Sequence, residues 1–133
     1  MKPYVWAFAA SLLAMAVLDA LWLGLLARDL YQDGIGPLMR AQPLWAAAGV
    51  FYLMYAAGLV WFAVRPQRNN PVVGQAALAG GLLGLLAYGT YDLSNLATLD
   101  GWPVHMVLVD MAWGALVSAA SAAAGQWAWN RRA

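Results

Sequence analysis

Four long apolar segments take up nearly the whole chain of 133 residues. They cover residues 4–27, 43–64, 72–99 and 102–129. Each is long enough to cross the hydrocarbon core of a bilayer, which needs roughly 20 apolar residues in a helix. Lipid cannot satisfy the open edge of a strand, so we expect the segments to be helical. The sequence therefore predicts an all-α polytopic membrane protein, an antiparallel four-transmembrane-helix bundle forming one domain over residues 1–133.

The composition excludes several other classes of protein. Only 10% of the residues are charged, whereas a soluble domain averages roughly a quarter. The absence of Cys excludes disulfides and thiolate chemistry. A net charge of +1 gives no basic footprint for nucleic acid. We therefore expect the lipid bilayer as the surroundings, no nucleic-acid partner and no cofactor.

The three connections between the segments differ in length and character. Residues 100–101 are almost the entire link between the last two segments. Gly101 can supply a positive φ after a helix end, and Pro103 suits the first turn of the next helix. This predicts a tight antiparallel hairpin. The longest connection, residues 28–42, is expected to form a small cap over one end of the bundle.

The basic residues are distributed unequally between the two ends of the predicted bundle. One end, which holds both termini and the middle link, carries Lys2, Arg65, Arg68, Arg131 and Arg132. The other end carries only Arg28 and Arg40. Because basic residues concentrate in cytoplasmic segments, we expect both termini to face the cytoplasm.

The eight Trp residues fall into two groups by depth. Six lie near the predicted boundaries and are typical of aromatic belts: Trp6, Trp61, Trp127 and Trp129 on the cytoplasmic side, and Trp45 and Trp102 on the outer side. The other two follow an intramembrane Asp by three residues, in the pairs Asp19/Trp22 and Asp110/Trp113. That spacing puts acid and indole on one helix face. We expect these indoles to satisfy a buried carboxylate or to fill the core.

Three aspartates, one in each of three segments, lie at the same predicted depth. Asp19, Asp92 and Asp110 are seven or eight residues from the outer ends of their segments, or roughly 10–12 Å at 1.5 Å per residue. An ionised carboxylate at depth costs about 2.5–3.5 kcal/mol, and no Lys or Arg shares this level. An acidic pocket without a counter-ion suits a cationic guest, a proton or a metal ion. The alternative is a polar network that only fixes the register of the helices.

Further polar residues extend this level to all four segments. Tyr52 and Tyr55 lie in the second segment, and Tyr88 and Asn95 follow helical spacing with Asp92 in the third. The candidate ligand-binding residues are therefore Asp19, Trp22, Tyr52, Tyr55, Tyr88, Asp92, Asn95, Asp110 and Trp113. Equal depth does not fix the rotation of each helix, so convergence of the carboxylates is not determined. The sequence identifies no catalytic residue. No metal site is predicted either, because His105 lies off the helix face of Asp110.

A ridge of small residues continues inward from Asp92 in the third segment. Ala76, Gly80 and Gly84 follow the same helical stripe. Such a ridge lets a second helix approach closely. The approaching helix could belong to the same chain or to a second copy in a homodimer.

Three motifs together resemble one known family. They are LDALWLG at residues 18–24, YGTYDLSNLAT at residues 88–98 and VDMAWG at residues 109–114. They are similar to domain of unknown function family 2177, small bacterial inner-membrane proteins with four predicted spans. The resemblance implies a bacterial source and an inner-membrane location. It implies no reaction, substrate or ligand.

Three functions are compatible with these features. The first is binding or transport of a small cationic or amphipathic molecule, or of a proton, at the Asp cluster. The second is an intramembrane enzyme that acts on a lipid or isoprenoid by carboxylate acid/base chemistry. The third is a structural or accessory subunit of a membrane assembly. Transport would need a homodimer, since a single bundle this small has little room for a gated path.

Overall fold

The structure is a computed structural model that describes residues 2–132. Within that range it consists of helices and their connections. The helices are α1 (Lys2–Leu21), η1 (Trp22–Leu26), α2 (Arg28–Ile35), η2 (Gly36–Leu38), α3 (Trp45–Leu59), η3 (Val60–Val64), η4 (Arg65–Gln67), α4 (Val73–Thr98) and α5 (Val104–Arg132). Both η1 and η3 are wider π-helical turns that continue the preceding helix.

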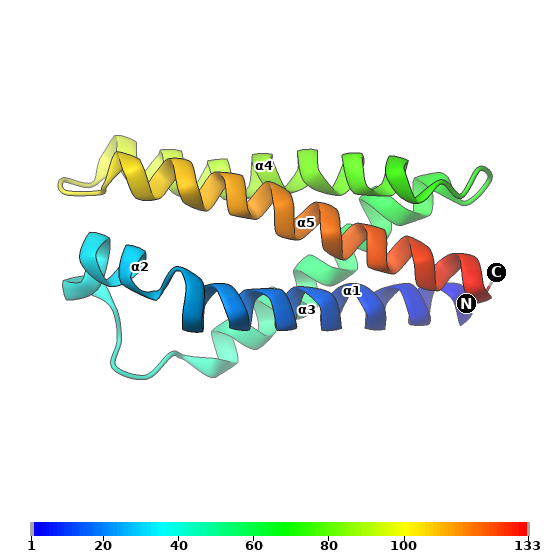
Figure 1. The fold of residues 1–133 in the computed structure, drawn as a ribbon, viewed down its shortest axis with the longest axis horizontal. Helices are drawn as coiled ribbons and strands as arrows, with labels where there is room; N and C mark the ends of the chain where they lie inside the picture. The colour runs from blue at the N-terminus through cyan, green and yellow to red at the C-terminus, as the bar shows by residue number, and fades with distance from the viewer. Residues whose placement is uncertain (1, 133) are drawn as a thin grey trace.

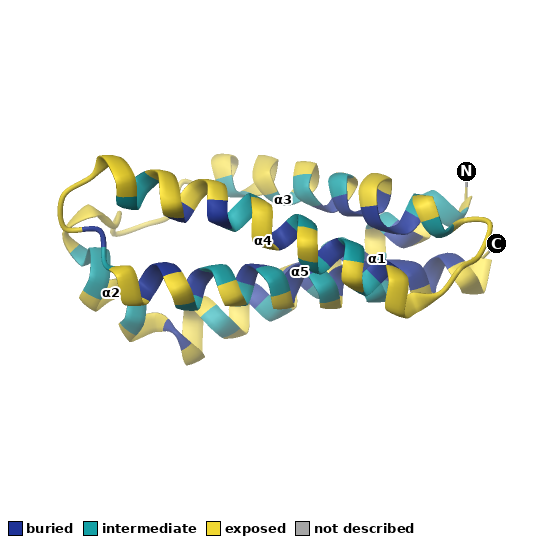
Figure 2. Ribbon diagram, turned by 90° about the horizontal axis from the view of Figure 1, so that it is seen from above, coloured by how far each residue is buried: buried dark blue, intermediate teal, exposed yellow. Residues whose placement is uncertain are grey.

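Four continuous helical stretches are long and apolar enough to cross a membrane: Lys2–Leu26, Trp45–Gln67, Val73–Thr98 and Val104–Arg132. Their bounds lie within a few residues of the predicted segments, and the prediction of an all-α four-span bundle is confirmed. Most exposed side chains on these helices are apolar, including Leu25, Leu86 and Leu108. Figure 2 shows exposed positions on the outward surfaces of the bundle and buried positions between the helices. This is the distribution expected of a protein solvated by lipid.

The helices α4 and α5 form the predicted hairpin and share the most extensive interface in the chain (Figure 1). Gly101, with φ of 78°, makes the turn between them. The ridge of Ala76, Gly80 and Gly84 is buried against α5. A Cβ added at Gly80 would lie 2.5 Å from Ala122 Cβ and 2.7 Å from the Ser118 carbonyl oxygen. The ridge is therefore used inside the chain, where it brings two backbones into contact.

The other two spans pack on this hairpin in different ways. α1 packs along α5, and the core where they meet contains Met15, Leu59 and Val117. α3 runs obliquely across the bundle (Figure 1). It contacts α4 mainly through η3, and its body lies on α1 and only slightly on α5. The start of α3 therefore diverges from the hairpin and leaves space at that end of the bundle.

The long connection forms the expected cap. Residues 28–42 contain α2 and η2, and α2 contacts both η1 and α5. Figure 1 places α2 and the α4–α5 turn at one end, and the two termini at the other. The five basic residues of the terminal end are thus separated from Arg28 and Arg40, as the sequence indicates.

The aromatic residues near the boundaries are only partly arranged as predicted. At the terminal end, the indoles of Trp6, Trp61 and Trp127 are exposed. Each carries an Arg guanidinium over its ring, at distances to the ring centre of 4.2, 3.9 and 5.0 Å. Trp129 and Trp102 differ, because both are buried. Trp129 packs edge-on against Tyr4 and Trp102 against Tyr91, so these two belong to the core and not to an aromatic belt.

We predict that Gly80→Ala destabilises the bundle, because the new methyl group would force α4 and α5 apart. The expected loss is about 1–3 kcal/mol of unfolding free energy, the usual effect of overpacking. Thermal unfolding in detergent would measure it.

The matched control is Gly81→Ala on the same helix. Its Cβ would meet α5 atoms at 3.5 Å, an ordinary contact distance. A similar loss in both variants would contradict the close approach at Gly80.

Candidate functional site

A cavity of about 740 Å³ lies between the spans at the α2 end of the bundle. This volume is within the range of small-molecule sites, roughly 300–1,000 Å³. All four spans and the cap contribute to its wall. The lining residues that carry chemistry are Asp19, Trp22, Arg28, Tyr31, Tyr52, Tyr88, Tyr91, Asp110 and Trp113, and the rest are mainly apolar. The divergence of α3 from the α4–α5 hairpin makes room for this cavity.

Asp19 has a hydrogen-bond donor on each carboxylate oxygen. The Tyr52 hydroxyl donates to Oδ2 at 2.8 Å, and the Trp113 indole N–H donates to Oδ1 at 2.9 Å. The side chain is only 6% exposed. The donors come from α3 and α5, so this one carboxylate joins three spans. Both donors are neutral, which leaves the negative charge of an ionised Asp19 uncompensated by a cation.

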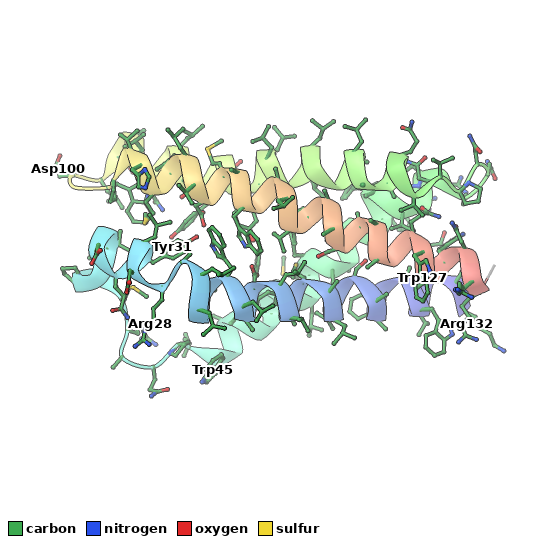
Figure 3. The ribbon with its side chains drawn as sticks, in the orientation of Figure 1. Arg28, Tyr31, Trp45, Asp100, Trp127 and Arg132 are labelled. Atoms are coloured by element: carbon green, nitrogen blue, oxygen red, sulfur yellow. The ribbon has the colours of Figure 1, made fainter. Side chains whose placement is uncertain are left out.

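Asp110 is held from the cap. The Tyr31 hydroxyl of α2 donates to Oδ1 of Asp110, and the Trp22 indole N–H donates to the Tyr31 oxygen at 3.0 Å. Figure 3 shows Tyr31 directed toward α5, while Arg28 of the same short helix points to the other side. Burial, followed by the bond to Asp110, raises the pKa of Tyr31 well above its usual value. Tyr31 is therefore a neutral donor at physiological pH.

The two intramembrane indoles stack directly on one another. The rings of Trp22 and Trp113 are 4.4 Å apart between centres and only 5° from parallel. The expectation that a buried indole satisfies a carboxylate holds for Trp113. Its partner, however, is Asp19 on another helix and not the Asp110 of its own helix. Trp22 bonds to Tyr31 instead of a carboxylate. Neither N–H group therefore bonds to the Asp that lies three residues before it on the same helix.

Asp92 lies beside Asp110 but outside the cavity wall. It is fully buried at 0% exposure, and neither of its oxygens has a hydrogen-bond partner among the described residues. Among residues 2–132, no three carboxylate or imidazole side chains lie close enough together to hold a metal ion. The three aspartates are thus split, with Asp19 on one side and the Asp92–Asp110 pair on the other.

The remaining candidate residues occupy different places. Tyr88 lines the cavity and covers Gly114 of α5, where any side chain would collide with its ring. Tyr55 lies deeper, where its hydroxyl shares a 2.6 Å hydrogen bond with Ser118. Asn95 is half-buried and lies outside the cavity wall. The structure therefore brings Asp19, Trp22, Tyr52, Tyr88, Asp110 and Trp113 together around one cavity.

Tyr31 is the main site residue that sequence reasoning missed. The residues of α2 are strongly amphipathic, and Leu30, Tyr31 and Ile35 pack on the cluster around Met106 and Trp102. That apolar face within a polar connection was the signal for a helix lying back on the bundle. Depth along the four spans could not reveal it, because Tyr31 enters from a connection.

The family model described as a predicted membrane protein (DUF2177) matches residues 4–127. The chain therefore belongs to this family, and the resemblance seen in its motifs is confirmed. No curated protein and no solved structure shows significant similarity to the chain.

We predict that Tyr52→Phe lowers stability, because it leaves Oδ2 of buried Asp19 without its donor. Interhelical hydrogen bonds in membranes contribute on average about 0.6 kcal/mol and at most about 1.7 kcal/mol. We expect a loss in this range in thermal or chemical unfolding in detergent. Tyr91→Phe is the matched control, since Tyr91 is exposed and its hydroxyl makes no hydrogen bond within residues 2–132. Equal stability of both variants would show that the Tyr52 bond contributes nothing.

Proposed function

We propose that this family member binds a small amphipathic cation in the cavity beneath α2. The observation that carries the proposal is a cavity between four candidate spans that is walled by aromatic rings and contains two carboxylates whose hydrogen-bond partners are all neutral. A bound cation would supply the positive charge that the neutral hydrogen-bond donors of these carboxylates do not provide. The fold and the family identify the chain as a membrane protein with four candidate spans, and cation binding is our extension of that finding.

Asp110 is the better of the two anchors for the positive group. Asp19 already accepts a bond on each oxygen. The Oδ1 of Asp110 accepts from Tyr31, while its Oδ2 accepts no hydrogen bond from the described residues. Arg28, the basic residue of the wall, points away from Tyr31 (Figure 3). A cation at Asp110 would therefore meet a carboxylate with an oxygen free to bind it.

The aromatic wall suits an organic cation better than a hydrated metal ion. Trp22, Trp113, Tyr52 and Tyr88 all line the cavity. Ring faces attract a desolvated cation by about 2 kcal/mol or more. At the rim, Phe51 and Tyr91 belong to lipid-crossing helices and are 44% and 53% exposed. These two residues give an apolar tail a route of contact from the cavity to the surrounding lipid.

The proposal is limited to binding. Transport by a chain this small would need a homodimer, and the ridge that the sequence offered for one lies against α5.

We predict that dodecyltrimethylammonium binds to the protein in nanodiscs of uncharged lipid, and that Asp110→Asn weakens this binding. Loss of a charge-assisted contact worth about 1.5–3 kcal/mol corresponds to an affinity loss of roughly ten- to hundredfold. Isothermal titration calorimetry, corrected with empty nanodiscs, would measure it.

Two comparisons control this experiment. Asp100→Asn removes an exposed acid at the α4–α5 turn and should leave the affinity unchanged. Dodecanol, with the same tail and no charge, should bind much more weakly than the cation. Equal binding by Asp110→Asn and the parent would refute the cation site. A changed lipid composition in cells that overproduce the parent protein would instead support the alternative of an intramembrane enzyme that acts on a lipid or isoprenoid.

We also propose that the protein resides in the bacterial cytoplasmic membrane with both termini in the cytoplasm. The family resemblance supports a location in the bacterial inner membrane. The orientation is supported by the concentration of basic residues at the terminal end, including Arg65 and Arg131, opposite the cap that carries Arg28. The cavity would then lie in the outer half of the bilayer.

The orientation can be tested with single cysteines, because the chain has none of its own. We predict that Ala41→Cys reacts with a membrane-impermeant maleimide in intact bacterial cells, since residue 41 is exposed at the cap end. Asn69→Cys, exposed at the opposite end, should react only after the cells are permeabilised. The reverse pattern would invert the topology.

A further inference from the structure

Asp92 is a buried acid that the proposed cation site does not use. Its side chain has no exposure, and both oxygens lack a hydrogen-bond partner in the described part of the chain. The other buried side-chain atoms in this condition within residues 2–132 are on uncharged residues: Trp102, Ser121 and Gln126. An ionised carboxylate without donors or counter-charge is far more costly to bury than those groups. Such a residue needs either a proton or a ligand.

The titratable groups that face Asp92 come from three elements. Asp110 of α5 is its immediate neighbour, Tyr31 approaches from α2, and Tyr91 lies on its own helix. The Tyr31 hydroxyl is already donated to Asp110. None of these groups carries positive charge, so none can compensate two adjacent carboxylates.

A single proton on the Asp92–Asp110 pair removes the repulsion between the two carboxylates and supplies the missing donor. Two ionised carboxylates side by side are both acceptors and repel one another. A protonated carboxyl, in contrast, has an O–H that can donate to its neighbour. With one proton on Asp92, its O–H donates to a lone pair on an Asp110 oxygen, so one of the two unpartnered Asp92 oxygens gains a hydrogen bond. Asp110 then keeps its negative charge, which is available to the cavity.

We infer that the Asp92–Asp110 pair holds one proton in the empty protein and releases it when a cation binds at Asp110. This inference rests on the proposed function. The charges balance, because the pair passes from one negative charge to two while one positive charge enters. The O–H bond of Asp92 breaks, its electron pair stays on the carboxylate, and the proton leaves through Asp110 and the cavity to water. The site therefore exchanges a cation for a proton.

Exchange of a cation for a proton requires that the affinity for the cation depend on pH. If binding of one cation releases one proton, linkage makes the affinity rise with pH, by up to about tenfold per pH unit. The rise persists over the pH range in which the empty pair is protonated and the occupied pair is not. Asp92→Asn should abolish this dependence, because the amide donates to Asp110 as the protonated acid does but cannot lose a proton.

The first experiment examines the empty protein by infrared difference spectroscopy at neutral pH. The parent should show the carbonyl band of an un-ionised carboxylic acid, which is resolved from the amide bands. The band should be lost in Asp92→Asn and kept in the control Asp100→Asn. Its absence from the parent would overturn the inference without any reference to cation binding.

The second experiment titrates dodecyltrimethylammonium into weakly buffered protein in nanodiscs and measures proton release. We expect close to one proton per bound cation for the parent and for Asp100→Asn, and none for Asp92→Asn, which still binds. Binding by the parent without proton release would overturn the inference and leave the proposed function intact. Failure of the parent to bind would refute the proposed function and the exchange together, while the infrared band still decides whether the pair holds a proton.

Discussion

The close approach of α4 and α5 is the contact on which the site depends. Gly80 and Gly84 let the two backbones touch, and Gly114 receives the ring of Tyr88. With the helices this close, Asp92 of one lies beside Asp110 of the other. Larger residues along the ridge would separate the pair and open the buried layer. Packing in the half of the bundle nearer the termini therefore sets the chemistry of the half that carries α2.

The polar layer divides into two parts with different properties. Asp19 is fully hydrogen-bonded and ties α1 to α3 and α5, which is the behaviour of a structural network. Asp110 accepts a hydrogen bond on one oxygen from a residue of the cap, and its neighbour Asp92 has no hydrogen-bond partner within residues 2–132. A site for a guest and a site for a proton can therefore coexist in one layer. The stacked indoles of Trp22 and Trp113 lie between these two parts and connect them.

Helical spacing and depth predicted much of the candidate site. Six of the nine residues proposed from the sequence line one cavity, and Asp92 lies beside Asp110, which is one of the six. Spacing did not predict the hydrogen-bond partners, because Trp22 and Trp113 bond across helices instead of along them. Asn95 shares the stripe of Asp92 yet lies outside the wall. Tyr31 was missed, since it enters from a connection.

The sequence by itself determined the class of protein, the four spans, the α4–α5 hairpin and the separation of the basic residues. These follow from a bilayer's fixed thickness and from local backbone rules, which act along one chain segment at a time. Only the tertiary structure decided which carboxylates meet, which one is satisfied and where the cavity lies. Those outcomes depend on the rotation of each helix and on the oblique path of α3, and both are set by side-chain packing between spans, which no single segment encodes.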